Sequence, residues 1–193
     1  MPRRFHVIGP RAAVQSFRAR LDAAGMQPRI ARDQRYMTLE RGALPPFERL
    51  PELRPSSAAD YRLVFESGAA MRAEELEEDP RQSDPIAYAR RVEEECRDGY
   101  TFLWIDRGGL CFRASMSART GDAVQIAGVY TPPERRNQGL ARRGMSELCA
   151  RLLERSRAAC LFVNDFNAPA IALYRRIGFR DHAAWASAFY DLR

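Results

Sequence analysis

Apolar residues recur along the chain at two spacings, and the spacing predicts which segments form helices and which form strands. Recurrence every three or four residues, as with Val14, Phe17 and Leu21, is typical of an amphipathic helix. Short apolar runs between turn residues indicate strands. Helices are therefore expected at residues 12–24, 56–76, 86–97, 140–157 and 168–177, and strands at residues 5–8, 35–40, 100–105, 110–116, 123–129, 161–163 and 185–192.

Prolines and glycines interrupt regular structure at residues 41–51, which predicts a linker. A strand, a helix and a strand precede it. Two helices, a meander of three strands, and then helix, strand, helix and strand follow it. This order predicts a mixed α/β sheet with helices on its faces. We expect residues 1–50 to be an N-terminal strand-helix-strand extension and residues 51–193 to be the main domain.

The extension has a weak counterpart at the other end of the chain. Both ends read as a strand, a helix, a glycine and a second strand, with Gly25 in one copy and Gly178 in the other. Two explanations stay open. The extension is either a degenerate half-copy of the C-terminal segment or a chance similarity between two generic strand-helix-strand stretches.

The composition is that of a soluble globular protein, since 46% of the 193 residues are hydrophobic and 29% are charged. No apolar run approaches the ~20 residues that span a bilayer. The basic N-terminus is not followed by the apolar core of a signal peptide. We therefore expect a cytoplasmic protein with no membrane partner.

The formal net charge of +6 suits a polyanionic ligand. Acidic residues gather in residues 74–98 and basic residues in residues 135–157. Either these segments hold an amine and a phosphorylated cofactor, or they are two solvated helix faces. All 31 basic residues are arginine, which indicates a bias of the source as much as a binding patch. Nucleic acid is therefore not the expected partner.

The cysteines are separated from one another and from both histidines. Because they form no CxxC pair and show no metal-ligand spacing, they predict buried or reduced thiols, and no metal is expected. The four positions are Cys96, Cys111, Cys149 and Cys160.

A strand, a proline-stiffened bend, a short loop and the start of a long helix follow one another in residues 129–142. The first amides of a helix lack internal partners and, with the helix dipole, attract anions. Gly139 and the small Ala141 would let a phosphate approach the backbone, and Arg136 and Arg142 add positive charge. The GxGxxG and GK[ST] patterns of other phosphate loops do not occur here.

A second motif runs from Asn167 to Phe179. Asn167 can cap a helix through its side-chain oxygen, Pro169 fits the first turn, and Gly178 ends the helix. Tyr174 would then lie on the face next to the buried stripe. Taken alone, such a tyrosine is more often a core or rim aromatic than a catalytic group.

Both motifs resemble those of the GNAT acyltransferases. Arg136 to Ala141 matches the Gln/Arg-x-x-Gly-x-Gly/Ala pattern of the coenzyme A pyrophosphate loop, and residues 167–179 match the N-x-x-A-x-x-L-Y-x-x-x-G-F signature. The resemblance covers roughly residues 53–193 and is closest to the glycine N-acyltransferase-like branch. It implies the GNAT fold, with a mixed, mostly antiparallel twisted sheet of about six to seven strands flanked by helices.

The resemblance also implies an N-acyltransferase that passes an acetyl or other short acyl group from acyl-CoA to an amine of a small molecule or protein, by direct attack in a ternary complex. In the family the tyrosine protonates the departing thiolate, which makes Tyr174 the expected catalytic residue. Backbone amides at the end of the central strand polarise the thioester in the family, which here implies the amides of Val129 and Thr131. A homodimer is left open. The residues expected to bind acetyl-CoA are Val129, Tyr130, Thr131, Arg136, Asn137, Gln138, Gly139, Leu140, Ala141, Arg142, Asn167 and Tyr174.

The general base is missing from its usual place. Many relatives carry a glutamate on the strand before the asparagine motif, and by spacing this position is Phe162, which cannot take a proton. A water chain, a carboxylate from the first helices, or weak or lost activity would each explain the difference. The candidate carboxylates are Glu66, Glu74 and Glu75, and the candidate aromatics of the acceptor site are Tyr88, Trp104, Phe162, Phe166 and Trp185.

Two other functions compete with catalysis. Phe162 favours a non-catalytic protein that binds CoA or a partner. The other is an arginine-rich nucleic-acid binder, which would require binding that depends strongly on salt. The acceptor is not identified by the sequence, although the acidic segment is a weak indication of a cationic amine.

Overall fold

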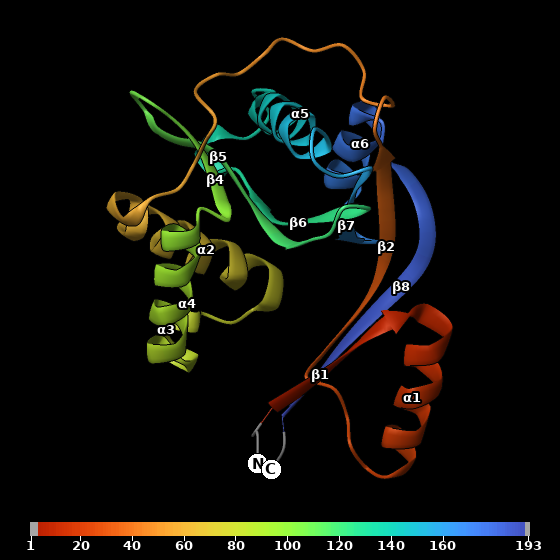
Figure 1. Ribbon diagram of the computed structural model, residues 1–193. Helices are drawn as coiled ribbons and strands as arrows, with labels where there is room; N and C mark the ends of the chain where they lie inside the picture. Colours follow the sequence, from red (N-terminus) through yellow and green to blue (C-terminus); the bar gives the residue numbers. More distant parts are fainter. Residues whose placement is uncertain (1–3, 192–193) are drawn as a thin grey trace. The chain divides into compact units, whose positions relative to one another are not determined.

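The computed structural model describes residues 4–191, which form two compact units (Figure 1). The terminal unit combines residues 4–39 with residues 160–191, and the central unit comprises Glu40–Ala159. The described strands number eight and pair mostly antiparallel. This is the expected mixed α/β architecture: two of the described strands lie in the expected N-terminal extension, and six lie in the main domain, where six to seven were expected.

The terminal unit contains the two ends of the chain. Its elements are β1 (Arg4–Pro10), α1 (Arg11–Ala23), β2 (Ile30–Glu40), β7 (Ala158–Asn164), α6 (Ala168–Ile177) and β8 (Arg180–Asp191). The strand order is β1-β8-β2-β7, and β8 pairs antiparallel with both β1 and β2. Helix α1 packs on β1 and β8 and buries Val14, whereas Phe17, which was expected on the same apolar stripe, is 43% exposed.

The central unit contains the remaining elements. They are β3 (Arg54–Pro55), the short turn η1 (Ala58–Asp60), α2 (Tyr61–Leu76), α3 (Pro80–Ser83), α4 (Pro85–Asp98), β4 (Thr101–Asp106), β5 (Gly109–Arg119), β6 (Ala123–Tyr130), the short turn η2 (Pro133–Arg135) and α5 (Leu140–Leu153). The strand order within this unit is β6-β5-β4-β3. The three strands expected as a meander are therefore neighbours in the sheet.

Two neighbouring residues of β5 show which helix covers which face of the central sheet, because successive side chains of a strand point to opposite faces. Phe112 packs against Gly144 of α5. Arg113 packs against Gly68 of α2. Helices α5 and α2 therefore cover opposite faces, and α4 packs beside α2 (Figure 1).

Local side-chain bonds explain why α2 begins where it does. The Asp60 carboxylate accepts hydrogen bonds from the backbone N–H of Ser57 at 2.8 Å and from its hydroxyl at 2.9 Å. Arg54 donates to the same carboxylate at 2.7 and 2.8 Å and holds the pKa of Asp60 well below its usual range. The Asp60 carboxylate therefore ties the start of the helix to Ser57 and to Arg54.

The expected elements are present, with shifts at their ends. The helix expected at residues 140–157 ends at Leu153, and the strand expected at residues 185–192 begins at Arg180. Residue 192 lies outside the described residues. The segment expected as a linker contains no helix or strand, but it is anchored, because Leu50 is buried. The short elements β3 and α3 were not expected, since so few residues carry no periodicity.

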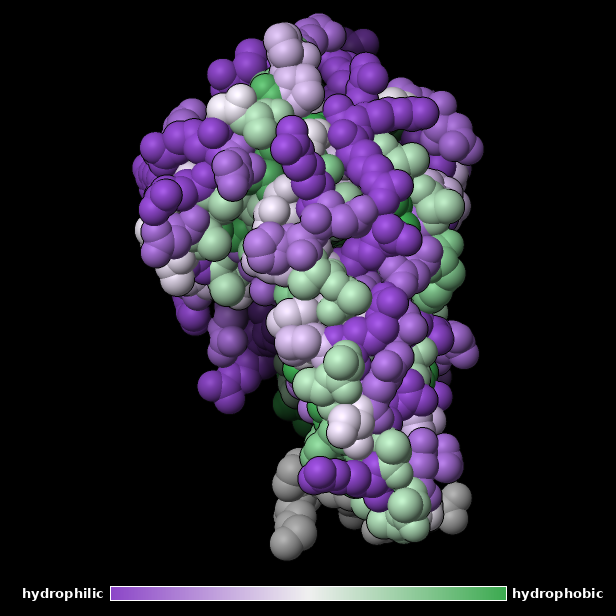
Figure 2. Space-filling model, turned by 90° about the vertical axis from the view of Figure 1, so that its right-hand side faces the viewer, coloured by the Kyte–Doolittle hydropathy of each residue, from purple (hydrophilic) through white to green (hydrophobic). Residues whose placement is uncertain are grey.

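Hydrophilic residues cover most of the face shown in Figure 2, with hydrophobic residues scattered among them. Such single exposures are normal for soluble domains. Among the helices that the structure describes, none combines the length and apolar character needed to cross a bilayer. The large hydrophobic residues that are exposed are Ile8, Phe17, Ile86, Tyr100 and Phe166.

Candidate functional site

Strand β6 carries a bulge just before the expected thioester contacts. Along β6 the pairing with β5 passes from Ala127 directly to Tyr130, while β5 advances by only two residues. Gly128 adopts a φ of 61°, which residues with a side chain rarely do. A bulge frees backbone groups from the ladder and bends the strand. The amides expected to polarise a thioester, those of Val129 and Thr131, follow it directly.

The loop after β6 leads into α5 through two left-handed residues, Asn137 with a φ of 62° and Gly139 with a φ of 76°. Gly139 is the N-cap of α5 and offers no side chain to the helix amides. The backbone amide of Arg143 donates to the Gly139 carbonyl at 3.1 Å. The amides of residues 140–142 precede this bond and stand at the uncapped helix start. This is the geometry of an anion site.

The two arginines expected at this loop have different surroundings. Arg136 donates from Nε to the Thr131 carbonyl at 3.0 Å, pairs with Glu74 at 2.7 Å and lies 5.7 Å over the Tyr130 ring. Arg142 is exposed and makes no hydrogen bond or ion pair with any residue in the described part of the chain. Arg136 therefore shapes the loop, and Arg142 keeps an uncompensated charge.

Asn167 and Tyr174 lie on α6 in the terminal unit. The Asn167 Oδ1 accepts a hydrogen bond from the Ala170 amide at 3.2 Å, which confirms the expected cap. Gly178 ends the helix with a φ of 105°, also as expected. Tyr174 is 6% exposed, and its ring centroid lies 5.8 Å from that of Phe179. Such burial limits the phenol to partners inside the protein or to a ligand that enters it.

Phe162, at the position where relatives carry a glutamate, lies in an aromatic cluster of the terminal unit. Its ring stacks on Tyr36 at 5.0 Å and lies 5.3 Å from Trp185, and His182 meets Tyr36 edge-on at 5.3 Å. Phe162 and Trp185 are thus packed against each other rather than along a polar pocket. The position of the usual base is an apolar contact here.

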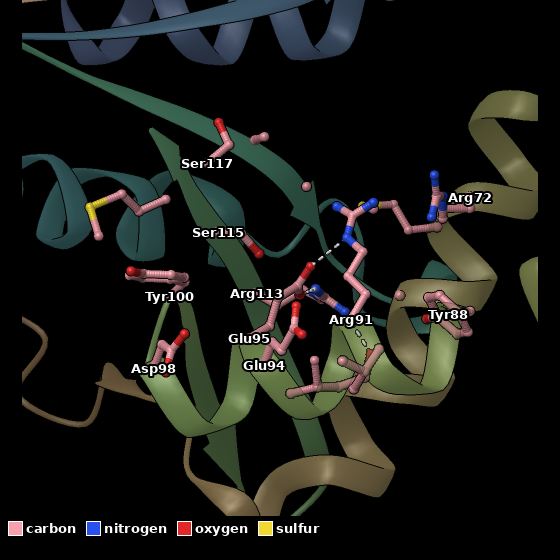
Figure 3. Close-up of a pocket in the computed structure, with 17 residues that line it drawn as sticks. Arg72, Tyr88, Arg91, Glu94, Glu95, Asp98, Tyr100, Arg113, Ser115 and Ser117 are labelled. Carbon is pink, nitrogen blue, oxygen red and sulfur yellow. Dashed lines mark hydrogen bonds and ion pairs between the residues drawn. The ribbon is translucent and has the colours of Figure 1, made fainter. Parts of the chain in front are cut away.

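The central unit has a pocket of ≈ 320 Å³ between α2, α4 and strands β5 and β6, called here the α2–α4 pocket (Figure 3). Apolar side chains such as Val64, Met71 and Val92 line part of its wall. The pocket reaches β6 at Ala127 and Gly128. The Met71 thioether lies 3.6–3.7 Å from where a Cβ on Gly128 would stand. The pocket therefore adjoins the bulge.

Arg113 is the most deeply buried charge that lines this pocket, with 3% of its side chain exposed. One terminal nitrogen donates to the Val64 carbonyl at 2.8 Å and to the Ser67 hydroxyl at 3.1 Å. The Glu95 carboxylate lies 3.8 Å from the other terminal nitrogen. Burial lowers the pKa of Arg113, and Glu95 acts against this shift.

Of the remaining aromatics expected at the acceptor site, Tyr88 lines the pocket. Its hydroxyl donates to the Phe65 carbonyl at 2.6 Å, and burial raises its pKa to about 12. Tyr88 therefore acts as a neutral structural donor. Trp104 is buried with Arg143 over its ring, and Phe166 is 68% exposed, so neither belongs to the pocket.

The carboxylates expected as bases have separate environments. Glu66 pairs with Arg81 at 2.6 Å and Glu74 pairs with Arg136 at 2.7 Å, so both charges are held by guanidinium groups. Glu75 lies one turn beyond Met71 on the same face of α2. Desolvation of its carboxyl group raises the pKa of Glu75, and the neighbouring Glu74 raises it further, although the residue as a whole is exposed. A raised pKa favours proton uptake.

Sequence patterns missed three features of this site. The bulge had a local signal, because an isolated glycine inside a strand marks irregular pairing, as at Gly128. Arg72 and Arg113 had none, since they reach the pocket from α2 and β5, which are distant in the sequence. The thiols are as expected, because all four cysteines are buried and free. Within residues 4–191, no cluster of three or more potential ligand side chains is arranged to hold a metal.

A profile of the acetyltransferase (GNAT) family matches residues 69–179, which is more than half of the chain. The matched segment includes the bulge, the loop before α5 and the whole of α6. A search of curated proteins finds no match.

Solved structures of similar fold bear related descriptions. A putative acetyltransferase from the GNAT family of Novosphingobium aromaticivorans is 20% identical, with a TM-score of 0.65 over 98% of this chain and 74% of that one. A GCN5-related N-acetyltransferase from Sphaerobacter thermophilus is 19% identical, with a TM-score of 0.61 over 98% and 60%. A tandem GNAT protein from the clavulanic acid biosynthesis pathway is 15% identical, with a TM-score of 0.59 over 97% and 63%.

At identities of 15–20%, these solved structures support the fold alone. The chain spans less than two thirds of the length of the last two proteins. The family profile goes further, because its match includes the segment that carries both sequence motifs. The chain therefore belongs to the acetyltransferase (GNAT) family, whose members use acyl-CoA as co-substrate.

Proposed function

We propose that this protein is an N-acyltransferase that passes an acetyl or other short acyl group from acyl-CoA to an amine of a small molecule or protein. One observation carries the proposal, namely the continuous stretch of bulged strand end, bent loop and uncapped helix start over residues 127–142. It offers the amides at the bulged end of β6 to a thioester and the amides of the uncapped helix start to a pyrophosphate. Membership of the GNAT family supports the same function.

In this proposal the pyrophosphate of acyl-CoA is held by the backbone of residues 137–142 and by the charge of Arg142. Arg136 keeps the loop in shape through Thr131 and Glu74. The pantetheine arm follows β6 at residues 129–131 and contacts Asn167, whose side-chain NH₂ is a donor not used in its cap. The family pattern supports these contacts.

The proposed reaction takes place in a ternary complex. The neutral amine attacks the thioester carbon, and the amides of Val129 and Thr131 donate to the oxyanion, an interaction that can contribute ~3 kcal/mol. The C–S bond breaks and the Tyr174 phenol gives its proton to the thiolate. The proton that leaves the amine goes to Glu75, directly or through water. An amide and the CoA thiol result, and the tyrosine regains a proton from solvent.

The substitution Tyr174→Phe tests this reaction. We expect kcat, measured as release of free thiol from acetyl-CoA with a library of amines, to fall by about 10² or more. Thermal stabilisation by CoA should persist, because the pyrophosphate contacts are unchanged. The control is Tyr61→Phe, a half-buried tyrosine on α2 outside the pocket, which should keep full activity. Full activity of Tyr174→Phe would exclude the phenol as the acid.

A second candidate function is non-catalytic binding of CoA, and the apolar surroundings of Phe162 favour it. The same experiment separates the two functions. Stabilisation by CoA without thiol release for any amine would support binding alone, whereas amine-dependent release would exclude it.

A further inference from the structure

Three hydrogen-bonded side chains lead from the bulge of β6 to a carboxylate of α4. Ser115 lies opposite Ala127, the residue before the bulge, and its Oγ is 3.6 Å from where a Cβ on Gly128 would stand. The same Oγ lies 2.8 Å from the hydroxyl of Thr101, its partner on the other neighbouring strand. Thr101 in turn donates to the Glu95 carboxylate at 3.2 Å. Two hydroxyl groups therefore connect the bulge to a carboxylate.

The three side chains belong to three elements of the central unit. Ser115 comes from β5, Thr101 from the start of β4 and Glu95 from α4. Ser115 and Glu95 line the α2–α4 pocket (Figure 3), whereas Thr101 is fully buried and joins them. Because water does not reach Thr101, a proton that moves from one end to the other passes between the hydroxyl groups.

The donors and acceptors fix the direction in which the hydroxyl hydrogens point. A carboxylate only accepts, and a hydroxyl has one hydrogen and two lone pairs. Because the Thr101 hydrogen goes to Glu95, the Ser115 hydrogen goes to Thr101. Residues 4–191 supply no other hydrogen bond to the Ser115 Oγ, so it keeps a lone pair for a donor in the pocket. The three groups are thus oriented to accept a proton at the bulge and to move it toward Glu95.

Glu95 is placed to hold this proton and then to release it. Its Oε1 accepts a hydrogen bond from Arg91 at 3.0 Å, while its Oε2 accepts the one from Thr101. The Glu95 side chain is 19% exposed, so its carboxyl group is in contact with solvent. One end of the hydrogen-bonded series therefore lies at the bulge, and the other reaches water.

The buried charge of Arg113 favours the loss of a proton from an ammonium group in this pocket. Its side chain lines the pocket, is 3% exposed and lies 3.8 Å from the Glu95 carboxylate, beyond hydrogen-bonding distance. A nearby like charge disfavours the charged form of a titratable group. An alkylamine, whose pKa in water is about 10, as in lysine, is therefore easier to deprotonate beside Arg113 than in water.

We propose that Ser115 and Thr101 form a proton relay that converts the bound ammonium ion into the neutral amine before it attacks. The ammonium gives a proton to the Ser115 Oγ, Ser115 passes its own hydrogen to Thr101, and Thr101 passes its own to Glu95, which releases a proton to solvent. A neutral amine and two intact hydroxyl groups result. This inference rests on the proposed function. It concerns an earlier proton than the one assigned to Glu75, which leaves the nitrogen after the attack.

The test compares the most active primary alkylamine of the amine library with its alkoxyamine analogue, in which oxygen replaces the methylene group next to nitrogen. The alkoxyamine has nearly the same shape but is already neutral at pH 7, so it needs no relay. Ser115→Ala and Thr101→Val should lower kcat/KM for the alkylamine by about 10²-fold and leave kcat/KM for the alkoxyamine nearly unchanged. The defect with the alkylamine should shrink as the pH rises toward the pKa of that amine, because solvent then supplies the neutral form.

Two further variants separate the relay from a general effect of mutation. Thr101→Ser keeps a hydroxyl at the centre of the relay and should restore most of the activity that Thr101→Val loses. Ser117→Ala removes another hydroxyl from β5, one that donates to the Gln125 carbonyl at 3.3 Å and takes no part in the relay. This control should behave as the parent protein with both amines.

The outcomes distinguish this inference from the proposed function. Equal losses of kcat/KM for the alkylamine and the alkoxyamine in Ser115→Ala would assign the serine a structural role, and full activity with both amines would assign it none. Either result would overturn the inference and leave the proposed function intact. Absence of thiol release by the parent protein with every amine of the library would overturn the proposed function and the inference with it.

Discussion

Among the single residues of the central unit, Glu147 carries a buried charge that its neighbours engage fully. Its side chain is 1% exposed. It accepts hydrogen bonds from Arg49 at 2.8 and 3.0 Å, from Arg151 at 2.7 Å and from the Leu50 amide at 3.0 Å. The bonds from Arg49, followed by those from Leu50 and Arg151, outweigh burial and lower the pKa of Glu147 to about 2. One helix residue thus anchors the segment expected as a linker.

The folded pKa of Glu147 lies below its ordinary value of 4.5, so the charge stabilises the fold above about pH 4.5. This contribution is lost as the pH falls toward 2. Glu147→Gln should lower the free energy of unfolding at pH 7 by about 3 kcal/mol and flatten its loss between pH 5 and 2, as measured by urea denaturation. The control Glu48→Gln removes an 81% exposed carboxylate and should change stability by less than ~0.5 kcal/mol. Equal effects of the two substitutions would contradict this account.

Glu75 gives a second prediction at the residue scale. A base must be unprotonated, so kcat/KM should rise with pH through the pKa of Glu75, which desolvation and Glu74 raise above 4.5. Glu75→Gln should lower kcat by about 10²-fold or more and remove this acidic limb from the pH profile. Glu66→Gln, whose carboxylate already pairs with Arg81, should keep the limb. If the acidic limb of the pH profile were unchanged in Glu75→Gln, another group or water would be the general base.

At the scale of elements, the contact between α5 and β5 depends on a residue without a side chain. A Cβ added to Gly144 would stand closer than 3.0 Å to three atoms of the Phe112 ring. The ring fills the space that glycine leaves, and real Cβ atoms do not approach that closely. Helix α5 therefore depends on this close approach for its seat on the sheet.

Gly144→Ala should destabilise the protein by about 1–3 kcal/mol in urea denaturation, because overpacking outweighs the ~1 kcal/mol that alanine gains over glycine inside a helix. The comparison is Gly121→Ala, at an exposed turn where nothing lies within 4 Å of an added Cβ. That substitution should leave stability unchanged or raise it by less than ~1 kcal/mol. A stabilising Gly144→Ala would show that Phe112 moves aside at little cost.

The same scale shows why some elements were predictable and others were not. Helix α6 carries its cap, its proline and its terminal glycine within its own sequence, so its expected bounds were right. Strand β8 begins at Arg180, earlier than expected, because the polar start of the strand pairs with β2 and needs no apolar alternation of its own. Strand β3 has two residues and exists through its pairing with β4.

At the scale of the whole molecule, the compact units do not follow the order of the sequence. The first strands pair with β8, as in the register of Val7 with Ala188. The two ends of the chain therefore build one unit together. The expected domain boundary at residue 50 stays a prediction. The resemblance to the glycine N-acyltransferase-like branch and the origin of the extension as a half-copy of the C-terminal segment also stay predictions.

The sequence by itself determined the family, the order of the main elements, the strand-loop-helix segment expected to bind a pyrophosphate and the cap of Asn167, because each depends on residues only a few positions apart. The tertiary structure alone decided the bulged pairing of β6, the α2–α4 pocket and the partners of its charges. Arg72, Arg113 and Glu95 come from α2, β5 and α4, and no spacing along the chain records that they line one pocket. Whether an arginine is paired with a carboxylate is a property of packing, which the spacing of residues along the chain does not record.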